Sequence, residues 1–125
     1  MANYLLDTNH ASPLVTLHHR LRQRVLDEIR NRHSFGVCAP ALSEFLFGIG
    51  VLLRAVQNRQ EWDNLRPRLT IYQVGEADAE MAADLQITLR RRGIQLETVD
   101  ALIAAVAIRY DLTLLTTDGD FLPIT

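Results

Sequence analysis

Residues 98–121 constrain the fold of this chain more than any other stretch. Apolar residues recur at helical spacing over residues 99–110 and leave almost no polar face, which predicts a helix buried on most sides. Asp111 and Leu112 break the pattern, and residues 113–117 are β-branched and leucine-rich, as in a short buried strand. A buried helix that leads into a buried strand is typical of an α/β sandwich.

Acidic residues mark both ends of this helix-strand unit. Thr98 is a candidate N-cap, which would place Asp100 in the first helical turn, where the helix dipole favours an anion. Asp118 and Asp120 follow the strand directly. Asp100 therefore has two interpretations, a simple helix-start acid or half of a metal site.

The rest of the chain alternates between strand and helix patterns in the order β, α, α, β, α, β, α, α, β. Strands are expected at residues 3–6, 35–39 and 69–74, helices at 14–29, 42–56 and 76–92, and a polar surface connection or helix end at 58–67. With 125 residues and no linker or repeat, the chain is expected to be one domain over residues 1–125. This order predicts a parallel sheet between two layers of helices.

Two further acids are expected near the same edge of the sheet. Asp7 follows the first strand, and the carboxyl ends of strands are where α/β sheets place their chemistry. Glu44 lies one turn before Gly48. A glycine inside a helix costs about 1 kcal/mol of stability relative to alanine, so we interpret Gly48 as a residue that leaves space beside the Glu44 carboxylate. Converging carboxylates require a cation, and oxygen ligands select Mg²⁺ or Mn²⁺.

The basic residues are unusual because all 13 are arginines and lysine is absent. This excludes receiver domains and aspartyl-phosphate phosphatases, which use a lysine. A net charge of −2 gives no overall basic surface, and each arginine cluster has the alternative interpretation of a solvated helix face. The triple-arginine run at residues 90–92, followed by Gly93, is interpreted as a helix C-terminus first.

The single cysteine and the hydropathy pattern indicate the cellular compartment of the protein. Cys38 lies in an apolar run and is expected to be a core thiol, and one cysteine without a signal-like start favours a reducing, cytoplasmic compartment. No apolar run approaches the ~18 residues that a membrane span needs.

Four motifs resemble those of one known family. They are LLDTNH at residues 5–10, EFLFG at 44–48, DALIAA at 100–105 and LLTTDGDF at 114–121. In this order and spacing they resemble the PIN-domain ribonucleases and, within them, the VapC-type toxins of bacterial toxin-antitoxin modules. The resemblance covers nearly the whole chain.

The resemblance implies a three-layer α/β/α PIN-like fold with a short parallel sheet of four or five strands. Family members commonly continue past the last motif into an edge strand, whereas this chain stops at Thr125. It also implies an Mg²⁺- or Mn²⁺-dependent endoribonuclease. The metal-binding catalytic acids that it implies are Asp7, Glu44, Asp100 and Asp118. Asp120 is a further candidate metal ligand, and the polar residues that accompany the acids are Thr8, Asn9 and Thr116.

The same resemblance implies three partners. These are an RNA substrate whose phosphates contact the arginines, a cognate antitoxin whose segment covers the acidic groove with a competing arginine, and a second copy of the chain. The alternative is a catalytically silent PIN-like module that binds RNA or protein, which loss of an acid would signal. A DNA nuclease of the flap-endonuclease type is disfavoured because those chains carry long insertions.

Overall fold

The computed structural model describes residues 2–7, 14–15, 20–115 and 121–123 of the chain. Within them a five-stranded sheet has the order β3-β2-β1-β4-β5. The strands are β1 (Asn3–Leu6), β2 (Ser34–Cys38), β3 (Thr70–Tyr72), β4 (Thr113–Leu115) and β5 (Phe121–Pro123). The first four pair in parallel and β5 pairs antiparallel with β4. The sheet thus has five strands rather than four, and the fifth forms an antiparallel edge where a proline is tolerated.

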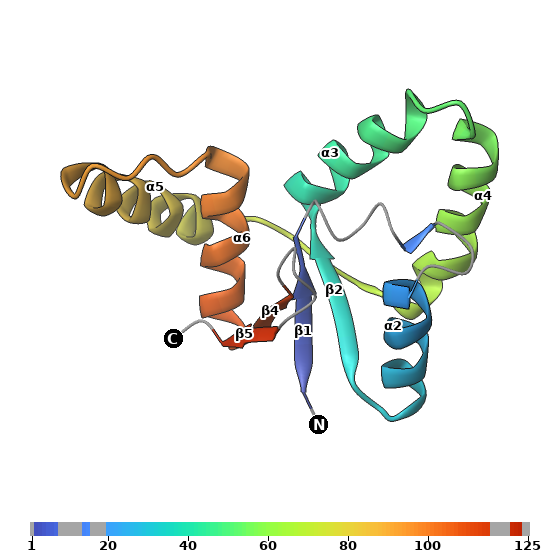
Figure 1. The fold of residues 1–125 in the computed structure, drawn as a ribbon. Coiled ribbons are helices and arrows are strands. Elements are labelled where there is room, and N and C mark those ends of the chain that lie inside the picture. The colour runs from blue at the N-terminus through green and yellow to red at the C-terminus, as the bar shows by residue number, and fades with distance from the viewer. Residues whose placement is uncertain (1, 8–13, 16–19, 116–120, 124–125) are drawn as a thin grey trace.

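Helices cover both faces of the sheet, which confirms the expected three-layer α/β/α architecture. They are α2 (Arg20–Arg30), α3 (Ala39–Gly50), α4 (Ala55–Leu65), the short 3₁₀ helix η1 (Arg66–Arg68), α5 (Glu76–Arg91) and α6 (Thr98–Arg109). Figure 1 shows α5 and α6 on one side of the sheet and α2, α3 and α4 on the other. Among the described residues, no helix is both long and apolar enough to cross a membrane.

The strand order contains a switch point between β1 and β4. From β1 the chain proceeds to β2 and β3 on one side, and then returns to β4 on the other side of β1. Right-handed crossovers therefore put the two sets of helices on opposite faces. The order reverses between β1 and β4, and ligands of open α/β sheets bind outside the carboxyl ends of strands at such a point.

The core is built from strands that are buried on both faces. Leu5, Leu6, Val37 and Leu115 have no exposed surface, as expected for a sheet covered by helices on each side. On one face the rings of Phe45 and Trp62 meet edge to face, with centroids 5.1 Å apart. Cys38 is fully buried in the same core, which confirms that it is a core thiol.

Helices α5 and α6 pack closely through small residues. The buried residues at this contact are Ala82, Ala101 and Ala105, with Met81, Leu96 and Leu102 packed against them. Helix α6 also buries Ile103, Val106 and Ala107. The expectation of a helix buried on most sides is therefore confirmed.

The helix predicted over residues 42–56 was wrong in its length. Helix α3 ends at Gly50 and α4 begins at Ala55, so two helices rather than one connect β2 to β3. Two glycines in the last turn of α3 weaken the helix there. Leu53 and Val56 consequently lie on the surface instead of in the core, with exposed fractions of 106% and 69%.

Two smaller expectations needed correction, and a third is only partly described. Residues 58–67 form most of α4 and η1, and Trp62 is buried rather than part of a surface connection. The N-cap of α6 is Glu97, one residue before the expected Thr98. The predicted helix at 14–29 is described from Arg20 onward, while residues 16–19 lie outside the described residues.

Candidate active site

Three of the predicted acids lie on elements that meet at one edge of the sheet. Asp7 follows β1 and is half-buried, Glu44 is exposed on the second turn of α3, and Asp100 is exposed in the first turn of α6. Figure 1 shows the starts of α3 and α6 at the edge toward which β1 and β2 point. The fold therefore brings together side chains that are 37 and 56 residues apart in sequence, from position 7 to 44 and from 44 to 100.

The electrostatics of Asp100 connect it with the other two carboxylates. Partial desolvation raises the pKa of Asp100, and the negative charges of Glu44, Asp7 and Glu97 raise that pKa further. A helix N-terminus alone would favour the ionised form and lower the pKa. The raised pKa is thus the direction expected for an acid in an acidic group and not for a helix-start acid alone.

The pKa of Cys38, the last residue of β2, also responds to the charge of Glu44. Burial is the main cause that raises the pKa of the Cys38 thiol, and the charges of Asp78 and Glu44 add to it. The thiol is therefore neutral at physiological pH and is not the activated thiolate of a cysteine nucleophile.

The space around Gly48 agrees with the expected need for room beside Glu44. A Cβ atom added at Gly48 would meet no atom of the described residues within 4 Å. The glycine is thus not required for close helix packing, and the surface one turn beyond Glu44 is open.

The acids fit a hard divalent cation in charge and in donor type. Asp7, Glu44 and Asp100 offer only oxygen, and their mutual repulsion is the condition that a bound cation relieves. Among the described residues no group of three acids, histidines or cysteines is close enough to hold an ion by itself. The expectation from the sequence is that a further ligand comes from the segment after β4.

That further ligand was predicted in a part of the chain that the structure does not describe. Asp118 and Asp120 lie outside the described residues, and so do the polar residues Thr8, Asn9 and Thr116. The described strand β4 ends at Leu115, directly beside Leu6 of β1 in the register of the sheet. The chain therefore leaves β4 next to the strand that carries Asp7.

Glu97 is a member of this acidic group that the sequence patterns did not single out. It is the exposed N-cap residue of α6, and its charge is one cause of the raised pKa of Asp100. The available signal was an additional acid three positions before Asp100, at the same helix end.

Several arginines are engaged in structural ion pairs. Arg22 donates to Glu61 at 2.8 Å and to the backbone oxygen of Leu14 at 2.8 Å, and so ties α2 to α4. Arg109 pairs with the buried Asp78 at 2.6 Å. In contrast, the side chains of residues 90–92 at the end of α5 are exposed and make no recorded ion pair within the described chain.

Comparison with known proteins assigns the family. The sequence model of the PIN domain matches residues 4–124. This chain belongs to the PIN-domain family. The matched range spans the positions of Asp7, Glu44, Asp100 and both late acids. A comparison with curated protein sequences finds no match.

Solved structures share the PIN fold with this chain. VapBC2 from Rickettsia felis, bound to a DNA fragment of its promoter, is 24% identical with a TM-score of 0.79, over 91% of this chain and 86% of that one. DNA-bound VapBC from Salmonella typhimurium is 20% identical with a TM-score of 0.75, over 91% and 85%. The sarcin-ricin loop cleaving toxin VapC20 from Mycobacterium tuberculosis is 15% identical with a TM-score of 0.67, over 94% and 91%. At these identities the similarity is one of fold.

Proposed function

We propose that this PIN domain is a VapC-type toxin, an Mg²⁺- or Mn²⁺-dependent endoribonuclease. The observation that carries the proposal is the position of Asp7, Glu44 and Asp100 at the switch point of a PIN fold, where partial desolvation and then the charges of Glu44 and Asp7 raise the pKa of Asp100. The structural relatives support the toxin assignment, since they include VapBC complexes and a toxin that cleaves the sarcin-ricin loop.

In this proposal the carboxylates have distinct roles. Asp7, Asp100 and Asp118 hold the metal, and Asp120 is the alternative fourth ligand. A bound divalent ion supplies water activation and charge stabilisation at the scissile phosphodiester. Glu44, exposed on α3, orients the attacking water and accepts its proton. The exposed arginines of residues 90–92 provide phosphate contacts that position the RNA.

Two protein partners complete the proposal. A cognate antitoxin covers the acidic edge with a segment whose arginine binds the carboxylates in a bidentate manner, in competition with metal. A second copy of the chain covers the apolar surface at the α3-α4 turn. Large side chains there are exposed, namely Phe47, Val51, Leu52, Leu53 and Val56. The same proposal puts the protein in the cytoplasm, because its RNA substrate is there.

The test is cleavage of total RNA with Mg²⁺ and with EDTA. We expect EDTA to abolish cleavage, and Asp7→Asn, Glu44→Gln and Asp100→Asn each to lower the rate about 100-fold or more. Asp84→Asn is the matched control, because Asp84 is exposed on α5 and takes no part in the acidic group. Cleavage that survives EDTA or Asp7→Asn overturns the mechanism.

Two further arms separate the alternatives. Asp118→Asn and Asp120→Asn are expected to be unequal, with the larger loss at Asp118, and equal, mild effects mean that the fourth acid is misplaced. RNA binding without cleavage by the wild type indicates a silent binding module. Cleavage of single-stranded DNA at the same rate as RNA indicates a DNA nuclease.

A further inference from the structure

A cavity lies at the turn between α5 and α6, outside the acidic group. Its volume is about 450 Å³, within the range of ~300–1,000 Å³ that is usual for small-molecule sites. The residues that line it are Gln86, Arg90, Gly93, Ile94, Gln95 and Leu96. Gly93 has a φ of +79°, so the glycine permits the tight turn that forms one wall.

The cavity is lined by a guanidinium group, aliphatic side chains and side-chain amides, and no acidic residue is among the lining residues. Arg90 offers a guanidinium plane, and Ile94, which is 51% exposed, offers an aliphatic surface. Gln86 and Gln95 offer side-chain amides. Unpaired RNA bases are recognised by stacking on such planes and by hydrogen bonds to their edges.

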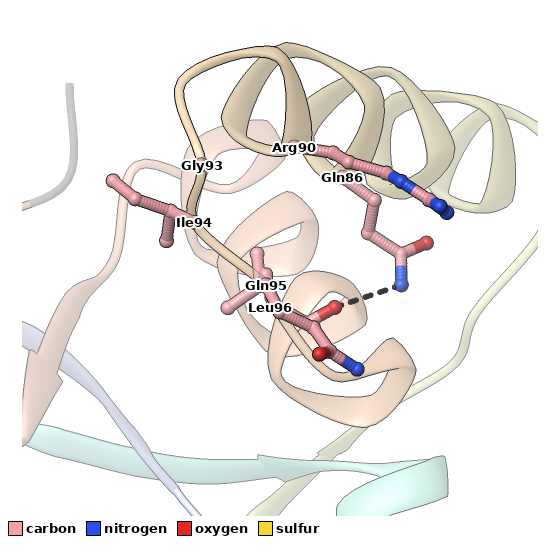
Figure 2. Close-up of a pocket in the computed structure, with 6 residues that line it drawn as sticks. All are labelled: Gln86, Arg90, Gly93, Ile94, Gln95 and Leu96. Carbon is pink, nitrogen blue, oxygen red and sulfur yellow. Dashed lines mark hydrogen bonds between the residues drawn. The ribbon is translucent and has the colours of Figure 1, made fainter.

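Gln86 is held in one orientation. Its Nε2 donates to the backbone oxygen of Leu96 at 3.0 Å and to Thr98 Oγ1 at 3.3 Å. Since the Leu96 oxygen can only accept, the amide nitrogen must face it, and Gln86 Oε1 remains as a fixed acceptor. Figure 2 shows this amide beside the end of the Arg90 side chain. A base edge with an amino group, as in adenine or cytosine, complements that acceptor.

The cavity and the acids flank the same helix end. Gln86 contacts Thr98, the first residue of α6, and Asp100 follows two residues later. Two residues turn a helix by roughly 200° and advance it by about 3 Å, so the cavity and Asp100 lie on opposite sides of the first turn. An RNA strand therefore has to wrap around the start of α6 to contact both the cavity and Asp100.

We propose that the cavity at the α5-α6 turn is a subsite for one unpaired base of the RNA substrate, with Arg90 stacking on the base and Gln86 Oε1 accepting from its amino group. The subsite rests on the proposed ribonuclease function and adds a determinant of where the RNA is cut. The subsite lies at the same end of α6 as Asp100, so the bound base and the scissile phosphate belong to different nucleotides of one RNA strand.

The test compares neighbouring arginines on the cleavage-deficient Asp100→Asn background. Fluorescence anisotropy measures the binding of short oligonucleotides of A, C or U. Arg90→Ala is expected to weaken the binding of oligo(A) and oligo(C) about tenfold. Arg91→Ala removes the same charge from the same helix end but from outside the cavity, and is expected to weaken all three sequences equally and by a smaller factor. Ile94→Ala and Ile87→Ala form a second matched pair of exposed isoleucines, of which only Ile94 lines the cavity.

Cleavage mapping with active protein separates this inference from the proposed function. We expect Arg90→Ala to change which positions of a long RNA are cut, while Arg91→Ala lowers the rate at the wild-type positions. If both variants cut at the same positions and bind the oligonucleotides equally, the subsite is overturned and the ribonuclease stands. If the wild type neither binds nor cuts RNA, both proposals are overturned.

Discussion

The Asp78 carboxylate, only 1% exposed, accepts a hydrogen bond from Arg109 Nη1 at 2.6 Å and so joins the start of α5 to the end of α6. Its Oδ2 also accepts from the backbone N–H of Gly75 at 3.0 Å, which satisfies one free donor at the N-terminus of α5. The guanidinium of Arg109 lies 4.8 Å from the centre of the Tyr110 ring. This pair fixes the two helices that carry Asp100 and the α5-α6 cavity.

Removing the arginine of this pair leaves a buried charge without its partner. We expect Arg109→Ala to lower the free energy of unfolding by about 2 to 3 kcal/mol, below the usual cost of breaking a fully buried pair, because the Arg109 side chain is 45% exposed. Urea denaturation measures the change. Arg92→Ala, an exposed arginine at the end of α5, is the control and should stay within ~0.5 kcal/mol. Equal effects of the two variants would contradict a structural role for the pair.

Gly36 is a second position where the fold depends on one small residue. A Cβ atom there would overlap the Tyr72 ring and lie 2.8 Å from the backbone oxygen of Thr70 on the neighbouring strand. Since backbone cannot move aside cheaply, Gly36→Ala should destabilise the protein by about 1 to 3 kcal/mol. Thermal unfolding checks this, and an unchanged melting temperature would show that Tyr72 has an alternative position.

Gly48 should respond in the opposite direction. Because an added Cβ meets no described atom within 4 Å, Gly48→Ala removes only the helix penalty of glycine and should stabilise the protein by about 0.5 to 1 kcal/mol. If the glycine keeps space open for substrate beside Glu44, the same variant should cleave RNA more slowly despite its greater stability. A variant that is more stable and equally active would assign Gly48 no role at the site.

The α3-α4 turn gives a prediction for self-association. Leu53 is fully exposed beside a hollow of about 390 Å³ lined by Leu46, Ile49, Ala55 and Val56. In a two-fold symmetric dimer the same surface of each copy forms the interface. Leu53 of each copy can then insert into the hollow of the other. We expect light scattering to give a dimer at tens of micromolar and Leu53→Asp to give a monomer with an unchanged melting temperature. A monomeric wild type would leave the patch to the antitoxin alone.

Strand and helix patterns predicted the layers and the acidic edge because both depend on local periodicity. The apolar run before Asp7 and the buried helix after Asp100 each specify an element, and parallel topology then brings their ends together. The missed break at Gly50 has a different cause. Leu53 and Val56 continue the apolar spacing of α3, so periodicity alone could not show that the chain turns before them.

The charged contacts of the site were less predictable. Asp78 matched a helix-start acid, and only tertiary packing reveals that Arg109 holds it in the interior. Glu97 likewise gains its influence on Asp100 from folded geometry. Sequence patterns give the type and order of ionisable groups, whereas burial and charge partners are set by how α5, α6 and the sheet pack.

Asp100 itself offers a test that requires no RNA. Its pKa is raised above the ordinary aspartate value of 3.8, so its charged form costs the folded state stability. That cost is absent below the ordinary value, grows as the pH rises through the raised pKa and is complete at neutral pH.

We therefore expect Asp100→Asn to raise the melting temperature of the metal-free protein at neutral pH by about 1 to 3 °C, since solvent screens an exposed carboxylate. The gain should shrink as the pH falls and vanish below 3.8, because the wild-type side chain takes up a proton over this range. Added Mg²⁺ should stabilise the wild type more than the variant, because the variant has lost one of the carboxylates that bind the ion. Asp84→Asn should show neither effect. A lower melting temperature without metal dependence would instead identify Asp100 as an acid that merely stabilises the start of α6 through the helix dipole.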